Sequence, residues 1–121
     1  MILKRNGLPT LIYRKTKEIL LTMKGAPQKF ENQGARLLYA VSLQKLGEKN
    51  EALKEYETFL PAYVGEEARC RYALFLKELG RGEDAKKIFE LIVKKCKISP
   101  PFYRKENKTW FETAQNELKN G

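Results

Sequence analysis

Apolar residues in the middle of the chain recur at three- and four-residue steps, the spacing of one face of an α-helix. The first run comprises Tyr39, Ala40, Leu43 and Leu46. It stops at Gly47, which suits a helix C-terminus that requires a positive φ. A second run begins near Asn50, and its stripe comprises Ala52, Leu53, Tyr56, Phe59 and Leu60. The pattern predicts two helices joined by a turn.

The same pattern returns 33 residues later. Residues 33–64 and 66–97 align without a gap, and ten of the 32 positions are identical. Chance would give roughly two identities with ordinary composition. Gly80 occupies the place of Gly47, between apolar runs that comprise Tyr72, Ala73, Leu76 and Leu79, then Ala85, Ile88, Phe89, Ile92 and Val93. We interpret the middle of the chain as two repeats of a helix–turn–helix.

Small residues and charge pairs refine this prediction. Ala40 and Ala52 are twelve residues apart, as are Ala73 and Ala85, and small side chains there allow the two helices of a repeat to approach closely. Oppositely charged residues four apart stabilise a helix, and the pairs predicted here are Glu67–Arg71, Glu83–Lys87 and Glu90–Lys94.

Stacked repeats need about three neighbours to bury a continuous core, so two repeats require caps. Ser99 and Pro101 suit a helix start, and a final helix is expected over roughly 101–119. We expect an N-terminal helix after Pro9, a frayed end over 1–8 and a loop over 24–32. The chain is then one all-α domain of six helices: a basic N-terminal helix and loop (1–32), two repeats (33–64 and 66–97) and a C-terminal capping helix (98–121).

The repeats resemble the tetratricopeptide repeat, a helix–turn–helix unit of about 34 residues. The resemblance covers 33–97 and rests on Tyr39-Ala40, Leu43, Ala52 and Tyr56 and on their counterparts Tyr72-Ala73, Leu76, Ala85 and Phe89. It departs from the family where Arg36 and Arg69 replace the usual tryptophan, where the closing proline is absent, and in the period of 33. The stretch from Ala35 to Leu79, which includes residues 66–73, also looks like the C-terminal part of larger bacterial members.

This resemblance implies antiparallel helix pairs stacked into a short right-handed superhelix whose first helices line a groove. The residues aligned with that groove are Leu37, Val41, Gln44, Lys45, Cys70, Leu74, Lys77 and Glu78. Apolar side chains stand where the family's carboxylate clamp needs polar ones, so an amphipathic helix fits better than a carboxylate. We therefore expect a non-catalytic scaffold that binds a peptide or helix of a protein partner. The alternative is that the N-terminal helix itself covers this strip.

Charge is unevenly distributed in the chain of net charge +9. Residues 1–29 carry a local +6 and residues 94–108 a local +5, whereas the stretch between them is nearly neutral. Basic and aromatic residues alternate after residue 100, as in surfaces that bind nucleic acid. The residues of this alternative surface are Lys94, Lys95, Lys97, Arg104, Lys105 and Lys108. The competing interpretation is that the aromatic residues form core and the charges only a solvated face.

The remaining composition argues against catalysis and metal binding. The chain has no histidine, so histidine-dependent triads cannot form within it. Cys70 and Cys96 are interpreted as buried apolar groups, because neither is part of a zinc-binding spacing. No apolar run reaches the ~18–20 residues of a membrane span. We expect a cytoplasmic protein without catalytic residues, metal or cofactor, with binding of residues 1–24 to anionic lipid as a further alternative.

Overall fold

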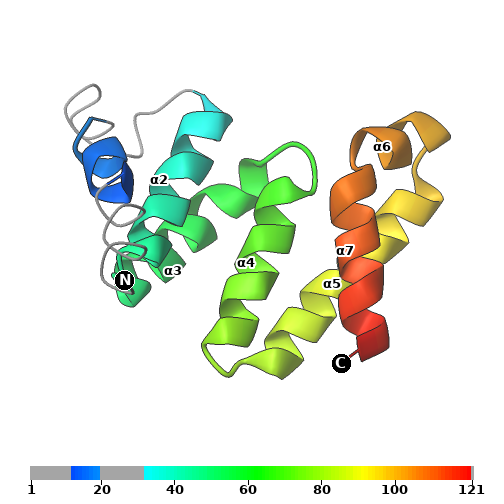
Figure 1. Ribbon diagram of the computed structural model, residues 1–121. Coiled ribbons are helices and arrows are strands. Elements are labelled where there is room, and N and C mark those ends of the chain that lie inside the picture. Colours follow the sequence, from blue (N-terminus) through cyan, green and yellow to red (C-terminus); the bar gives the residue numbers. More distant parts are fainter. Residues whose placement is uncertain (1–11, 20–31, 121) are drawn as a thin grey trace, which may run out of the picture. The chain divides into compact units, whose positions relative to one another are not determined.

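The computed structural model describes residues 12–19 and 32–120, and every regular element within them is a helix (Figure 1). The all-α class predicted from the sequence is therefore confirmed. The chain divides into two compact units between Tyr63 and Val64, here called unit 1 and unit 2.

Unit 1 contains a helix over 12–19, then α2 (Gln33–Lys45), α3 (Lys49–Phe59) and the 3₁₀-helix η2 (Leu60–Ala62). The side chain of Asn32 accepts a 3.1 Å hydrogen bond from the amide of Ala35 and so caps α2. The predicted turn is confirmed, because Gly47 has a φ of 82° and α2 packs against α3 beyond it. Most of the segments predicted as a frayed end and a loop lie outside the described residues.

Pro61 explains why α3 ends at Phe59, before the last residue of the predicted apolar stripe, Leu60. Proline has no amide hydrogen to donate along a helix, so the chain tightens into η2 after Phe59. The aligned position in the second repeat is Lys94, and there the helix continues to Ile98.

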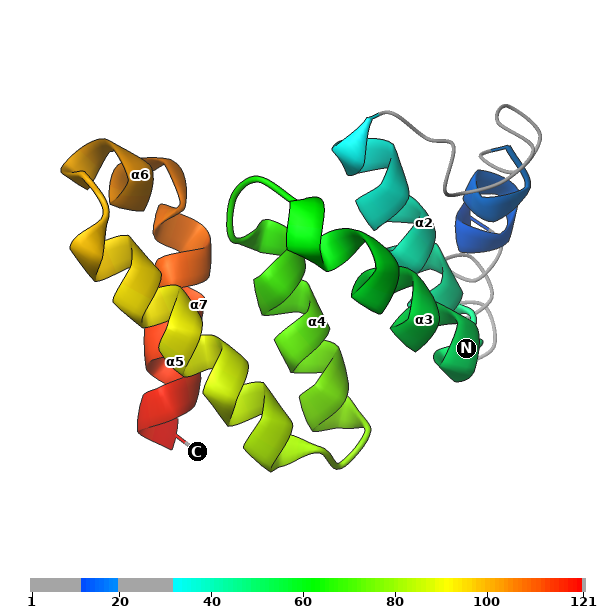
Figure 2. The ribbon, with the colours of Figure 1, turned by 180° about the vertical axis from the view of Figure 1, so that it is seen from behind.

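Unit 2 contains α4 (Glu67–Glu78), α5 (Gly82–Ile98), α6 (Pro101–Glu106) and α7 (Lys108–Asn120). Helix α5 is central, since it packs against both α4 and α7 (Figure 2). At the end of α4, the amide of Gly80 donates to the carbonyl of Lys77 and that of Arg81 to the carbonyl of Leu76. These two bonds satisfy carbonyls at the helix end and require the φ of 81° that Gly80 adopts.

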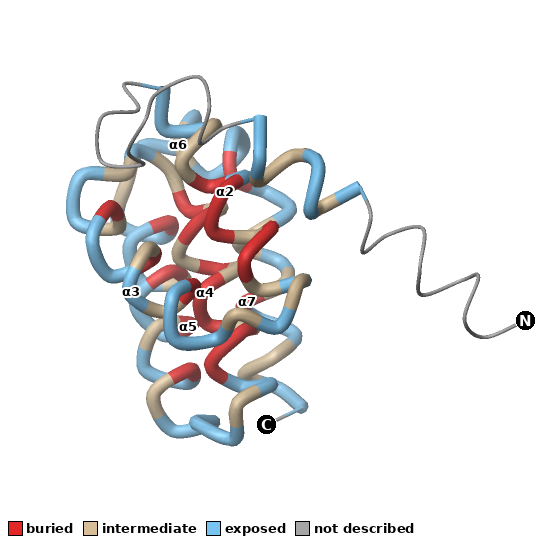
Figure 3. The backbone as a smooth tube through the Cα atoms, turned by 90° about the vertical axis from the view of Figure 1, so that its left-hand side faces the viewer, coloured by how far each residue is buried: buried red, intermediate tan, exposed pale blue. Residues whose placement is uncertain are grey.

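The helix bounds follow the sequence repeat. Helix α4 ends 33 residues after α2, and α5 begins 33 residues after α3. In Figure 3 buried and exposed positions both occur along α2, α3, α4 and α5. The alanines predicted to lie between paired helices are at most 1% exposed: Ala40, Ala52, Ala73 and Ala85. Their burial is what close packing of paired helices needs.

The prediction of one C-terminal helix over 101–119 is wrong. The chain forms α6 and α7 instead, separated at Asn107. The side chain of Asn107 donates to the carbonyl of Tyr103 and accepts a 3.0 Å bond from the amide of Glu66. These bonds hold Asn107 outside regular helical geometry, with a ψ of 25°. The exposed residues of α7 are all polar, as an end cap requires, and comprise Lys108, Thr109, Glu112, Gln115, Asn116, Lys119 and Asn120.

Candidate protein-binding surface

Within unit 2, one face of α4 meets α7 and forms what we call the α4–α7 surface: Arg71, Leu74 and Lys77 of α4 with Trp110 and Glu117 of α7. The guanidinium carbon of Arg71 lies 5.2 Å from the centroid of the Trp110 ring. The ammonium of Lys77 lies 2.6 Å from a carboxylate oxygen of Glu117. Leu74 is three residues from each of these α4 positions, so it lies on the same helix face.

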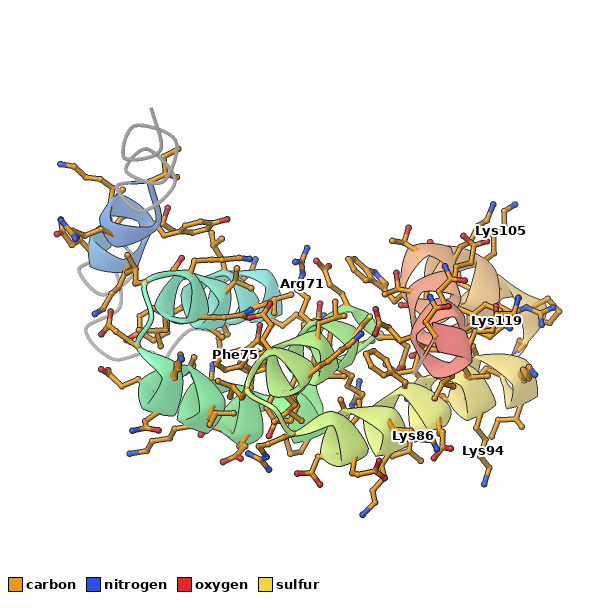
Figure 4. All side chains as sticks on the ribbon, turned by 60° about the horizontal axis from the view of Figure 1, so that its bottom comes forward. Arg71, Phe75, Lys86, Lys94, Lys105 and Lys119 are labelled. Carbon is orange, nitrogen blue, oxygen red and sulfur yellow. The ribbon has the colours of Figure 1, made fainter. Side chains whose placement is uncertain are left out.

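The charged groups of this surface are held in place. Arg71 also donates a 2.9 Å bond to Glu67, the predicted pair one turn earlier. Figure 4 shows the Arg71 side chain extending away from α4. A cation above an indole ring contributes ~0.5–1 kcal/mol at an exposed site. The surface thus presents a half-buried leucine between a stacked cation and an ion pair, a combination suited to an amphipathic segment.

A cleft of about 180 Å³ lies at the Lys77 end of this surface. Its lining residues come from the three long helices of unit 2: Lys77, Gly82, Glu83, Ala85, Lys86, Phe89, Glu117 and Leu118. It is therefore a continuation of the α4–α7 surface toward the start of α5.

The predicted groove residues of unit 2 divide into two groups. Leu74 is half-buried, and Lys77 and Glu78 are exposed, so these three offer surface to a ligand. Cys70 is fully buried, and burial raises the pKa of its thiol to about 12. Cys70 is therefore a core residue with an unreactive thiol, and the groove assignment is corrected at that position. Cys96 is also buried, and both cysteines are free thiols, as interpreted from the sequence.

The predicted groove residues of unit 1 are similarly mixed. Leu37 is 6% exposed and belongs to the core, so its assignment is also corrected. Val41 and Gln44 are half-buried, whereas Lys45 is exposed. The Gln44 side chain accepts a 3.2 Å hydrogen bond from the hydroxyl of Tyr56, which links α2 to α3. This bond gives Gln44 a structural role in unit 1.

The structure does not bring the predicted nucleic-acid residues onto one face. Lys95 lies over the ring of Tyr103, at 5.5 Å from its centroid, and the guanidinium carbon of Arg104 lies 5.7 Å from the centroid of Phe111. In Figure 4, Lys94 and Lys105 point to opposite sides of unit 2. Lys97 of α5 and Lys108 of α7 are exposed. Part of the basic segment thus covers aromatic rings.

Sequence reasoning missed a buried polar cluster that joins the start of α4 to α6. The Glu66 side chain is 1% exposed and accepts a hydrogen bond from the hydroxyl of Tyr103. Burial, together with this bond to Glu66, raises the pKa of Tyr103. Lys95 and Arg69 place their cationic nitrogens 3.8 and 3.9 Å from the same carboxylate. No local signal marks this cluster, because Glu66 and Tyr103 are 37 residues apart.

Within 12–19 and 32–120, no group of three or more cysteine and acidic side chains is placed to hold a metal ion. None of the helices described there is long and apolar enough to cross a membrane. Comparison of the chain with protein-family models, curated proteins and solved structures finds no match.

Proposed function

We propose that the chain is a non-catalytic protein-interaction module of the helical-repeat type, which holds a peptide or helix of a partner protein. The 33-residue recurrence, with its resemblance to tetratricopeptide repeats, supports this proposal. In such arrays, antiparallel helix pairs present extended surfaces to ligands. The segment would be held on the α4–α7 surface.

The observation that carries the proposal is the half-buried Leu74 between the Arg71–Trp110 and Lys77–Glu117 contacts. Tryptophan and arginine are the residue types most enriched at interface positions that dominate binding energy. An apolar side chain of a partner seated on Leu74 would complete its burial. The flanking charges would then lie at the polar rim of the interface.

The charge balance of the same surface favours a protein over a nucleic acid. Binding to a phosphate backbone relies on uncompensated cations. Here Lys77 is paired with Glu117, and Arg71 with Glu67. The basic segments of the chain would instead raise the rate of encounter with an acidic partner.

The test compares Leu74→Glu with the matched control Leu91→Glu. Leu91 lies on α5 and is 63% exposed, so the same chemical change is made away from the α4–α7 surface. Each variant would be titrated by calorimetry against a partner segment first mapped by photo-crosslinking from residue 74. We expect Leu74→Glu to weaken binding by about tenfold or more, because it buries a charge in the interface. We expect Leu91→Glu to leave binding unchanged.

Circular dichroism and thermal melting keep this test interpretable. We expect both variants to retain wild-type helix content. A large loss of helix in Leu74→Glu would show that Leu74 belongs to the core. Lys77→Glu would then probe the surface, because Lys77 is exposed. Equal affinities for the wild type and the surface variant would contradict the proposal.

A further inference from the structure

A second surface in unit 2 lies along α5, beside the end of α7. It is a shallow groove of about 370 Å³, here called the α5–α7 groove. The residues that line it are Glu90, Val93, Lys94, Lys97, Ile98 and Leu118. The five α5 positions follow a pattern of three- and four-residue steps, so they form one face of that helix. They span about 12 Å, a little over two helical turns.

The floor of this groove is apolar. Ile98 is 75% exposed, whereas Val93 and Leu118 are half-buried. By contrast, the exposed residues of α7 are all polar. An exposed isoleucine beside two half-buried aliphatic side chains is surface that gains free energy when a partner covers it.

The rim of the groove is basic. Lys94 and Lys97 are exposed, and neither has an ion-pair partner among the residues that the structure describes. The predicted Glu90–Lys94 pair does not form there. Figure 4 shows Lys94 extending away from α5, on the same side as Lys86, which lies two turns earlier. The lining thus carries two ammonium groups against the one carboxylate of Glu90. This net positive charge beside an apolar floor is complementary to a ligand with an apolar stripe and flanking carboxylates.

From this geometry we infer that the α5–α7 groove is a docking site for an acidic amphipathic helix of a partner protein. The helix would set apolar residues three or four apart against Val93, Ile98 and Leu118, and its carboxylates would meet Lys94 and Lys97. A second copy of the chain fits less well than an acidic helix, because the second groove would carry the same net positive charge. The inference goes beyond the proposed function, since its ligand contacts neither Leu74 nor the two charged contacts that flank Leu74. Leu118 alone is shared, because it also lines the cleft at the Lys77 end of the α4–α7 surface.

A designed peptide tests the inference directly. The probe is a fluorescein-labelled helical peptide with leucine at every third or fourth position and glutamate and alanine elsewhere. Fluorescence anisotropy measures its binding to the full chain. We expect Lys94→Glu/Lys97→Glu to weaken binding by about tenfold or more. The control Lys54→Glu/Lys105→Glu makes the same charge change at exposed lysines outside the groove, and it should bind like the wild type.

Two further arms identify the binding mode. Ile98→Ser should also weaken the acidic peptide, because the floor loses its most exposed apolar residue. A peptide with lysine in place of glutamate should bind the Lys94→Glu/Lys97→Glu variant better than the wild type. Leu74→Glu should leave acidic-peptide binding unchanged, so this inference and the proposed function can fail independently.

Several results would overturn the inference. The acidic peptide could fail to bind the wild type, or could bind both double variants equally. Single-stranded RNA or phosphatidylserine vesicles could displace the acidic peptide from the wild type and fail to bind the Lys94→Glu/Lys97→Glu variant. That result would assign the groove to phosphate-bearing ligands. A concentration-dependent dimer that dissociates on Ile98→Ser would assign it to a second copy.

Discussion

Replacing Tyr103 by phenylalanine removes one oxygen from the buried cluster around Glu66. The hydroxyl of Tyr103 donates to the Glu66 carboxylate, which is 1% exposed. Nothing else in the packing of the ring needs to change. The substitution therefore isolates the bond that joins the start of α4 to α6.

The expected cost follows from the surroundings of the carboxylate. A hydrogen bond to a charged group contributes ~1.5–3 kcal/mol, and leaving a buried carboxylate short of a donor adds to the loss. Lys95 and Arg69 partly compensate, but they lie 3.8 and 3.9 Å away. We therefore expect unit 2 to lose about 2 kcal/mol of unfolding free energy. With a urea m-value of about 1 kcal/mol/M, the midpoint falls by about 2 M.

Trp110 provides the assay, because it is the single tryptophan of the chain and lies in α7 of unit 2. Its fluorescence during urea titration reports the unfolding of that unit. Tyr13→Phe is the matched control, because it also removes a tyrosine hydroxyl. Among the residues that the structure describes, the Tyr13 hydroxyl has no hydrogen-bond partner. The control should shift the Trp110 transition by less than about 0.5 kcal/mol.

The pH dependence sharpens this prediction. The pKa of Tyr103 is raised in the folded state, so its contribution is fully present below the unfolded pKa of about 10. That contribution is lost as pH rises through the higher folded pKa. The difference in stability between the wild type and Tyr103→Phe should therefore shrink at strongly alkaline pH. The reasoning would be refuted if Tyr103→Phe lowered the unfolding free energy no more than Tyr13→Phe does. It would also be refuted if Tyr103→Phe cost as much in a chain that carries Glu66→Gln as it does in the wild type.

Two further predictions concern the turns and the N-terminal contact. Gly80→Ala should destabilise unit 2 by about 1 kcal/mol, because the φ of 81° at position 80 is unfavourable for a residue with a Cβ. Gly82→Ala should stabilise unit 2 by ~0.4–1 kcal/mol, because position 82 lies in a helix and an added Cβ there meets open space. Thermal unfolding followed by Trp110 fluorescence measures both, and changes of the same sign would refute this account. The side chain of Lys17 donates a 2.8 Å hydrogen bond to Glu48, and this bond lowers the pKa of the Glu48 carboxyl. The contribution of Glu48 to folding stability is therefore present above its unfolded pKa of about 4.3, and it is lost as pH falls through the folded pKa. Glu48→Gln should therefore cost ~0.5–1 kcal/mol at pH 7 and almost nothing near pH 2, in melts followed by circular dichroism, and a pH-independent difference would contradict this.

The turns and paired helices could be predicted because their signals are local. Gly47 and Gly80 stop apolar runs at equivalent positions, and both adopt a positive φ at the end of a helix. The break at Asn107 could not be predicted, because the amide that its side chain accepts from belongs to Glu66, 41 residues away. Helical periodicity extends across residues 101–119 without revealing that partner.

The candidate surface shows the same division. Periodicity places Leu74 and Cys70 on one side of α4, but it does not reveal which neighbour covers each. In the folded chain Cys70 is fully buried and Leu74 is half-buried. Trp110 and Glu117 complete the surface from α7, and their contacts with α4 join positions about 40 residues apart. Neither contact has a sequence signal of its own.

Site-specific photo-crosslinking tests the central claim most directly. A photoreactive residue would replace Leu74, and a control chain would carry it at the exposed Lys54 of α3. Both would be irradiated in native lysate with and without nuclease. We expect a protein adduct at position 74 that survives nuclease and is absent at position 54. We also expect that a synthetic copy of the crosslinked partner segment binds the wild type but not the Leu74→Glu variant. Adducts that disappear with nuclease, or that form equally at both positions, would contradict the central claim.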